Sequence, residues 1–389
     1  MSRNNTVFLK ICLCMLCLIT LVSCDYKLYS DNQIVHGTSI IKTDNCIYYF
    51  DREANWSISE DDAIKYQNLY KYDIQTGVSE KIDSNQYIGD MYLIDGKLYY
   101  LCANFKNTPK DLDAKEKNIG FRVHSYDGKK MTDEGSVDID YSLDDGMVKS
   151  ELLPIRRFTY NGGKISKLNN NLILQYNNQV YLQNGGYFKA VSDNVTSFSI
   201  SNNEIYYSYG VNIYKKADFK NMNIGKVLIS EDEIRNLESV KNIFNDCSLI
   251  IKDITVTNEY MYFLVTEENT GHGYPYKYSF AEKTLMPLSE IKECTDHMIY
   301  NEPNLFFYNI SQKNMFIKYG DNNPIDVNPK DFIDKTSNVE SFDVFEKTIY
   351  FSIRNEDDTL TYYKINDGKA SILFEWLRCD LSNTYTIIS

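Results

Sequence analysis

The stretch that decides the fold is "NCIYYFDRE", residues 45–53, in which a turn residue is soon followed by a run of large side chains. The same arrangement of a polar turn and an apolar run recurs along the chain. Its copies are "GKLYYLC" (96–102), "NEIYYSY" (203–209), "EYMYFLV" (259–265), "NLFFYNI" (304–310) and "KTIYFSI" (347–353). A single copy could be an aromatic platform on which a ligand stacks, whereas repeated copies indicate the strand of a repeated fold.

The flanking residues define a repeating unit. A short strand, an Asn-, Asp- or Gly-rich turn and the apolar strand follow one another, which is a strong hairpin signal. A third strand comes next in most units, as in "NLYKYDIQTG" at 68, and a fourth closes some of them, as in "KASILF" at 369. The second strands begin their apolar runs at Ile47, Leu98, Leu172, Ile205, Met261, Leu305 and Ile349.

The spacing of these strands predicts a β-propeller. The intervals between successive second strands are 51, 74, 33, 56, 44 and 44 residues, and a four-stranded blade takes about 40–50. "CIYYF" and "NLFFY" lack the apolar and polar alternation of a strand with one wet face, so both of their faces are expected to pack between neighbouring blades. We expect a single all-β propeller over residues 38–389 with seven blades, six or eight being the alternatives.

Two irregular stretches interrupt the repeat, near residues 138–163 and near 230–246. The first reads as a loop insertion or as a degenerate eighth blade. In the second, Ser230 and Glu233 match a capping box. Residues at helical spacing follow: Ile234, Leu237, Lys241 and Phe244. We therefore expect one amphipathic helix over residues 230–245, packed on the propeller between two blades.

The phrases "IYYFD" and "LYKYDIQTG" carry a family resemblance. They resemble the YWTD-type propeller of the low-density-lipoprotein-receptor-related class and, more closely, the propeller-like repeats of unknown function found on bacterial surface lipoproteins. Ile47, Tyr48 and Asp51 match the pattern, while Tyr49 and Phe50 replace its Trp and Thr. The later Asp-Gly turns match at 127–128 and 367–368. The resemblance covers roughly residues 38–375 and implies a propeller domain.

The first residues resemble the signal peptide of a bacterial lipoprotein. Arg3 and Lys10 precede an apolar run over residues 11–22 that is too short to span a bilayer comfortably. "LVSC" at 21–24 resembles a lipobox, in which Ser23 fills the small position and Cys24 receives the lipid. This resemblance implies a signal peptide over 1–23, a lipidated N-terminus and tether over 24–37, and attachment by acyl chains such as palmitate to the extracytoplasmic face of a bacterial cell membrane.

Composition and charge exclude some partners. The formal net charge is −13, and cleavage after residue 23 lowers it to −15 because Arg3 and Lys10 are lost. A chain so acidic repels nucleic-acid phosphates, and no basic stripe offsets the repulsion. We therefore expect no nucleic acid among the partners.

The cysteines and histidines match no common metal or catalytic motif. The cysteines beyond the lipobox are dispersed, at Cys46, Cys102, Cys247, Cys294 and Cys379, and their odd number excludes complete disulfide pairing in a monomer. One disulfide remains open, and buried inert thiols are expected for Cys46 and Cys102. The four histidines are equally scattered. The sequence thus predicts no catalytic, cofactor-binding or metal-binding residue and no cofactor.

Two functions remain open. The lipid tether, the acidic surface and the lack of catalytic motifs favour a binding or scaffolding module for an unknown protein or glycan partner. The alternative is an extracellular hydrolase of the glycosidase type that uses a pair of carboxylates on the rim. Its candidate residues cluster in the first irregular stretch, at Asp138, Asp140, Asp144 and Asp145. Whether the ring closes by borrowing an N-terminal strand such as "QIVHG" at 33 is also open.

Overall fold

The turn-plus-strand phrases fold as expected: each forms the second strand of an antiparallel meander in the computed structural model. The structure describes residues 34–38, 40–52, 67–83, 88–104, 120–138, 164–176, 178–217, 225–244, 247–288, 295, 297–301, 304–309, 314–319, 325–326, 338–345, 348–354, 360–366 and 369–375.

The first three meanders follow the short strand β1 (Ile34–Thr38). Their strands are β2 (Ile40–Lys42), β3 (Cys46–Arg52), β4 (Gln67–Asp73) and β5 (Ser79–Asp83); β6 (Ile88–Ile94), β7 (Lys97–Asn104), β8 (Gly120–Tyr126) and β9 (Met131–Asp138); and β10 (Lys164–Leu168), β11 (Asn171–Tyr176), β12 (Gln179–Asn184) and β13 (Tyr187–Ser192).

The remaining meanders follow in chain order. Their strands are β14 (Val195–Ser201), β15 (Glu204–Tyr209), β16 (Asn212–Lys216) and β17 (Lys226–Ile229); β18 (Leu249–Val256), β19 (Tyr260–Glu267), β20 (Gly273–Ser279) and β21 (Thr284–Pro287); β22 (His297–Asn301), β23 (Asn304–Asn309), β24 (Asn314–Tyr319) and β25 (Ile325–Asp326); and β26 (Asn338–Phe345), β27 (Thr348–Arg354), β28 (Leu360–Asn366) and β29 (Lys369–Glu375). Two helices, α2 (Glu231–Arg235) and α3 (Glu238–Phe244), lie between β17 and β18.

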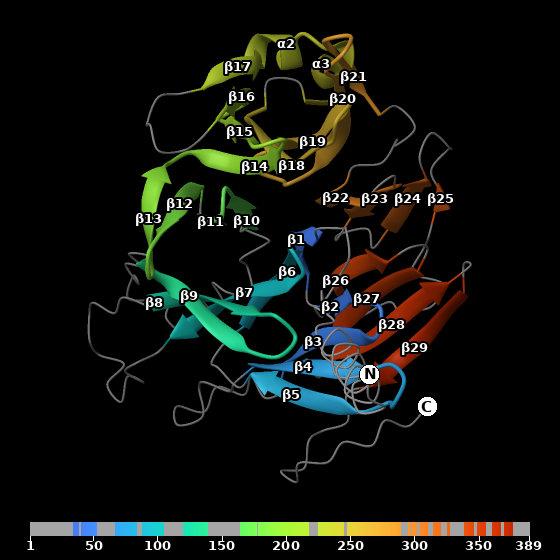
Figure 1. The fold of residues 1–389 in the computed structure, drawn as a ribbon. Coiled ribbons are helices and arrows are strands. Elements are labelled where there is room, and N and C mark those ends of the chain that lie inside the picture. Colours follow the sequence, from blue (N-terminus) through green and yellow to red (C-terminus); the bar gives the residue numbers. More distant parts are fainter. Residues whose placement is uncertain are drawn as a thin grey trace, which may run out of the picture.

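The meanders surround a common centre in chain order, as Figure 1 shows, with the first strand of each on the inside. Neighbouring first strands contact one another from β2 to β22, and β2 contacts β26, so that the beginning and the end of the chain meet in the ring. Five of the meanders are separate four-stranded sheets, and the other two, β6–β9 and β10–β13, belong to one nine-stranded sheet. This is the all-β, propeller-like arrangement that the repeat predicts.

Consecutive tyrosines explain why the strands are apolar on both faces. Side chains alternate across a strand. Tyr48 therefore packs with the β6–β9 meander, while Tyr49 packs with Tyr350 and Tyr362 of the last sheet. The pair of residues 99–100 divides in the same way between two neighbouring meanders. The prediction that these aromatic side chains pack between blades is confirmed, and none of these pairs is a ligand platform.

One join was not predicted: β9 and β13, the outermost strands of two neighbouring meanders, pair in parallel. Ser136 lies opposite Tyr187, and the Ser136 N–H donates to the Gly186 carbonyl at 3.1 Å. Gly135 has a positive φ of 138°, and a Cβ there would lie 2.7 Å from the Gly186 carbonyl carbon. Glycine at 135 is what allows the two backbones to approach so closely.

The helical insertion is present, but the prediction of one helix over 230–245 is wrong. The capping box of Ser230 and Glu233 forms as expected. The first helix ends at Arg235, the N–H of the following Asn236 still bonds to the Asp232 carbonyl, and a tighter turn leads into α3. The break shifts the buried face by one residue, so Val240 is buried in place of Lys241. Both helices pack between the β14–β17 and β18–β21 sheets, as predicted.

Strand β1 lies at the inner edge of β6 and also contacts β10 and β26 (Figure 1). The last sheet, by contrast, consists of β26–β29, all from the C-terminal part of the chain. The N-terminal strand thus lines the inside of the ring, and no strand is borrowed to close the described part of the last sheet. β1 begins within the 24–37 range predicted as tether. No described helix is long and apolar enough to cross a membrane.

Candidate functional site

The residues that the sequence singled out lie largely beyond the described parts of the structure. Cys24, the predicted lipid acceptor, falls outside the described residues, as do Asp140, Asp144 and Asp145 of the hydrolase alternative. Asp138 is the last residue of β9. The structure therefore tests neither the lipidation of Cys24 nor the carboxylate pair of the hydrolase alternative. The candidate site described below consists of other residues.

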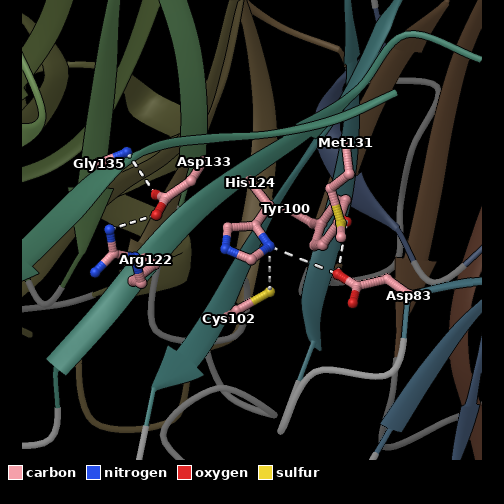
Figure 2. A network of polar contacts seen from close by, with 8 residues as sticks. All are labelled: Asp83, Tyr100, Cys102, Arg122, His124, Met131, Asp133 and Gly135. Carbon is pink, nitrogen blue, oxygen red and sulfur yellow. Dashed lines mark hydrogen bonds and ion pairs between the residues drawn. The ribbon is translucent and has the colours of Figure 1, made fainter. Parts of the chain in front are cut away.

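A cluster of Asp83, Cys102 and His124 lies between the first two meanders (Figure 2). In the β7–β8 ladder, Tyr100 is opposite His124 and Cys102 is opposite Arg122, so these side chains share one face. Asp83, the last residue of β5 in the neighbouring sheet, lies against that face. The cluster depends on two sheets and exists only when they pack together.

Both acidic partners of the histidine approach the same ring nitrogen. His124 Nδ1 lies 3.7 Å from the Cys102 Sγ and 3.5 Å from the Asp83 Oδ2. The donor atoms of the three residues all lie within 4.8 Å of one another. Asp83 and Cys102 are buried and His124 is nearly so.

Surrounding groups fix the orientation of the cluster. The Tyr100 hydroxyl donates to Asp83 Oδ2 at 2.9 Å and also lies 2.9 Å from the Met131 sulfur. Its ring packs edge-on against the His124 imidazole with centroids 5.9 Å apart. Burial, together with the neighbouring Cys102 and Asp83, raises the pKa of Tyr100, so the phenol stays neutral and donates its proton to the carboxylate.

A β-bulge shapes the far side of the site. The β8–β9 register shifts between Val123 and His124, which leaves one extra residue on β9. Asp133 beside this bulge pairs with Arg122 and accepts from the Gly135 N–H at 3.1 Å (Figure 2). Arg122 is therefore paired with Asp133. The cluster consists of the Asp83 carboxylate, the Cys102 thiol and the His124 imidazole.

This geometry does not suit nucleophilic catalysis. In a catalytic triad the carboxylate and the nucleophile bond to different nitrogens of the imidazole, whereas Asp83 and Cys102 both face Nδ1. Burial raises the pKa of the Cys102 thiol well above its usual value, and the Asp83 and Asp133 charges raise it further. A reactive cysteine needs the opposite shift. Aspartate, cysteine and histidine at these distances are instead a set of metal-ligand types.

Sequence reasoning missed this cluster for a physical reason. Asp83, Cys102 and His124 lie on three different strands, β5, β7 and β8, and Asp83 belongs to a different sheet from the other two. Their spacing in the sequence therefore matches no metal-binding motif. The strand of "GKLYYLC" was predicted, and β8 follows it as the third strand of the same meander. The register of these two strands, which brings Cys102 near His124, depends on a connection of fifteen residues, 105–119, that carries no turn signal fixing it.

A second polar feature joins the inner strands. The Lys164 ammonium at the start of β10 donates to the Phe198 carbonyl on β14 at 2.6 Å and lies 3.5 Å from the Ile254 carbonyl on β18. Asp253 continues the line by accepting from the Met298 N–H of β22 at 2.8 Å. Burial lowers the pKa of Lys164 to about 8, and Asp253 opposes the shift. Lys164 thus links neighbouring first strands across the inside of the ring.

The lowered pKa of Lys164 predicts a pH dependence of stability. Between about pH 8 and 10.4 the unfolded chain keeps this proton and the folded chain releases it, so the free energy of unfolding rises with pH in this window, by at most about 1.4 kcal/mol per unit. Replacing Lys164 with methionine should abolish that contribution in chemical denaturation series across the window. Lys167→Met on the same strand, whose ammonium pairs with Asp95 at 2.8 Å, should retain it, and an unchanged slope in Lys164→Met would contradict the prediction.

Comparison with known proteins supports the fold. No family model and no curated protein sequence matches the chain. Among solved structures, the β-propeller domain of the trilobed protease from Pyrococcus furiosus, which has an open velcro topology, is 11% identical with a TM-score of 0.52, over 88% of this chain and 98% of that domain. Acylaminoacyl peptidase from Pyrococcus horikoshii is 10% identical with a TM-score of 0.51, over 88% of this chain and 52% of that one.

A third similar structure is virginiamycin B lyase from Staphylococcus aureus, 11% identical with a TM-score of 0.47, over 86% of this chain and 97% of that one. This chain spans about half the length of the acylaminoacyl peptidase. At such identities the similarity to the two structures with TM-scores above 0.5 shows the propeller-like fold and nothing about activity.

Proposed function

We propose that this chain is a lipid-anchored binding or scaffolding module that holds a seven-bladed propeller at the extracytoplasmic face of a bacterial membrane, where it binds a protein or glycan partner. The observation that carries the proposal is the position of β1. This strand begins ten residues after Cys24 and lies inside the ring. A lipid on Cys24 would therefore hold the propeller by its centre and not by a loose end.

The direction of β1 supports one end of the ring as the end from which the proposed tether leaves. Ile34 lies opposite Leu93, close to the point where β6 turns into β7. The other turns from first to second strands gather at this end, which we call the near end.

This direction orients the ring on the membrane. Ten residues extend at most about 35 Å, so a lipid on Cys24 keeps the near end close to the bilayer. The opposite end, which we call the far end, carries the second-to-third-strand connections and those between meanders, including α2 and α3. The strand ends that flank 105–119 and 139–163, two of the longest connections, are at the far end. We infer that the far end faces away from the membrane and binds the partner, because loops on a rigid scaffold commonly form binding sites.

The blade number is also part of the proposal. The two meanders β6–β9 and β10–β13 count as separate blades, because β9 and β13 pair only at their outer edges. Together with the five four-stranded sheets they make seven. Each core cluster joins residues of two consecutive meanders, as in the cluster containing Tyr48 and Leu98. The relation to the YWTD-type and surface-lipoprotein repeats belongs to the same proposal.

The hydrolase alternative has less support. Three of its four candidate carboxylates lie outside the described residues, and the Asp83, Cys102 and His124 cluster is arranged unlike a catalytic triad. The binding module remains the function that the arrangement favours.

Accessibility on intact cells tests the proposed orientation. Ala281 and Asn269 lie in exposed turns at opposite ends of β20. Ala281 is at the near end, since the neighbouring Phe280 N–H bonds to the Glu259 carbonyl in a first-to-second-strand turn. Both variants are made in a chain in which Cys247, Cys294 and Cys379 are replaced by serine, while the buried Cys46 and Cys102 are kept. A bulky maleimide that does not cross membranes should then label Asn269→Cys several times faster than Ala281→Cys.

The control is the same pair of variants with Cys24→Ala. The chain should then leave the membrane fraction, and the two cysteines should react at similar rates. Equal labelling in the anchored chain, or faster labelling of Ala281→Cys, would refute the orientation. Capture of a protein or glycan from a mild detergent extract, lost when the far-end turn at 268–272 is altered, would identify the partner.

A further inference from the structure

We propose that Asp83, Cys102 and His124 bind a zinc ion. The distances match a tetrahedral site. Zinc–sulfur and zinc–nitrogen bonds of about 2.3 and 2.0 Å place the two donors about 3.5 Å apart, and zinc-bound nitrogen and oxygen lie about 3.4 Å apart. The structure has Sγ and Nδ1 at 3.7 Å and Nδ1 and Oδ2 at 3.5 Å. Two of the three donor–donor distances thus match a tetrahedral site, and the third is no longer than 4.8 Å.

The donor types select the metal. Calcium and magnesium prefer oxygen ligands throughout, whereas one sulfur, one nitrogen and one carboxylate oxygen suit zinc. Binding replaces the thiol proton, which leaves to solvent, by a metal–sulfur bond. Thiolate and carboxylate then balance the two charges of the ion, so the buried site is neutral and the cost of burying charge is reduced. A fourth position remains, which water occupies in many zinc sites with three protein ligands.

The surrounding residues hold these ligands in place. Metal-bound carboxylates are commonly hydrogen-bonded by a second layer of residues, and here the Tyr100 hydroxyl donates to Asp83. The same ring packs against the His124 imidazole. Cys102 and His124 lie on adjacent strands of one ladder, which fixes their backbones. Tyr100 is therefore a positioning residue for two of the three ligands.

The location suggests what the ion would do. Asp83 belongs to β5 of the first sheet, while Cys102 and His124 belong to β7 and β8 of the second meander. An ion bound by all three would join the two at their apolar interface, which includes Cys102, and the first of these sheets is one of the two at which the ring closes. Because such a site does not exist in the unfolded chain, binding would stabilise the fold.

Titration of the purified full chain with metal alone tests the proposal. After treatment with a chelator and a reductant, the chain should take up one Zn²⁺, and its melting temperature should rise by several degrees. Cobalt(II) should give a thiolate-to-cobalt charge-transfer band together with the strong visible bands of a tetrahedral site. Zinc X-ray absorption should show a single sulfur neighbour with nitrogen and oxygen neighbours.

Matched variants separate ligation from folding. Cys102→Ala and His124→Gln should each lose the cobalt bands, whereas Cys46→Ala, which removes the other buried thiol of the same cluster, should keep them. Tyr100→Phe keeps the ring and removes the hydroxyl, so it should weaken metal binding about 10–100-fold. Melting of the metal-free variants shows that each is folded. Absence of the charge-transfer band in the unaltered chain, or its persistence in Cys102→Ala, would overturn the proposal.

Discussion

Replacing Tyr49 with alanine is expected to lower the free energy of unfolding by about 3–5 kcal/mol, the usual cost of deleting a buried aromatic side chain. Tyr49 is 4% exposed and stacks on Tyr70 of its own sheet, with ring centroids 5.5 Å apart. It also meets Tyr362 of the last sheet edge-on at 5.4 Å. Among the described residues no strand of the first sheet pairs with a strand of the last, and Tyr49 packs in the apolar cluster that the two sheets share, so the substitution weakens the closure of the ring.

Chemical denaturation of four variants separates the closure contact from general packing. Tyr49→Ala, Tyr362→Ala and the double variant form a cycle, and the edge-on pair should give a coupling of about 0.5–1.5 kcal/mol. Tyr187→Ala is the control, because this side chain is 48% exposed and its loss should cost less than about 0.5 kcal/mol. Additive effects within about 0.3 kcal/mol would show that the two rings do not hold the ends of the chain together.

Replacing Gly135 with alanine should be nearly as damaging. The new Cβ would lie 2.7 Å from the Gly186 carbonyl carbon and 2.8 Å from its oxygen, and the backbone has a φ of 138° that alanine rarely adopts. Strain and overpacking each cost about 1–3 kcal/mol, so the free energy of unfolding should fall by about 2 kcal/mol or more. Hydrogen exchange should also show faster exchange of the Ser136 amide, whose bond to Gly186 holds β9 against β13.

Gly185→Ala is the matched control for this join. Gly185 also has a positive φ, of 65°, but a Cβ there would meet nothing within 4 Å. It should cost only about 1 kcal/mol, the penalty of a left-handed backbone, and leave the Ser136 amide protected. Equal losses in the two variants would mean that the close approach of β9 and β13 contributes nothing to stability.

The repeat was readable from the sequence because its signals are local. A polar turn followed by an apolar strand depends on few neighbouring residues, and every anchor from Ile47 to Ile349 lies on a second strand. The apolar character of both strand faces also predicted the packing between sheets, because only a strand enclosed on both sides can bury consecutive tyrosines. The third and fourth strands at "NLYKYDIQTG" and "KASILF" followed by the same reasoning.

The features that were missed depend on contacts between distant parts of the chain. The parallel pairing of β9 with β13 requires Gly135 to meet Gly186, which nothing in either local sequence indicates. The metal-ligand cluster requires a β7–β8 register and the approach of Asp83 from another sheet. In the helical insertion, the pattern gave the correct start at Ser230 and missed the break at Asn236, where asparagine, a weaker helix former, allows a tighter turn.

The central claim is that a lipid on Cys24 holds the ring by the strand at its centre. Intact mass spectrometry of the mature chain, isolated from membranes, tests this most directly. The account predicts a chain that begins at Cys24 and carries the added mass of a diacylglyceryl group on that residue. An unmodified Cys24, or an N-terminus at any other position, would contradict it.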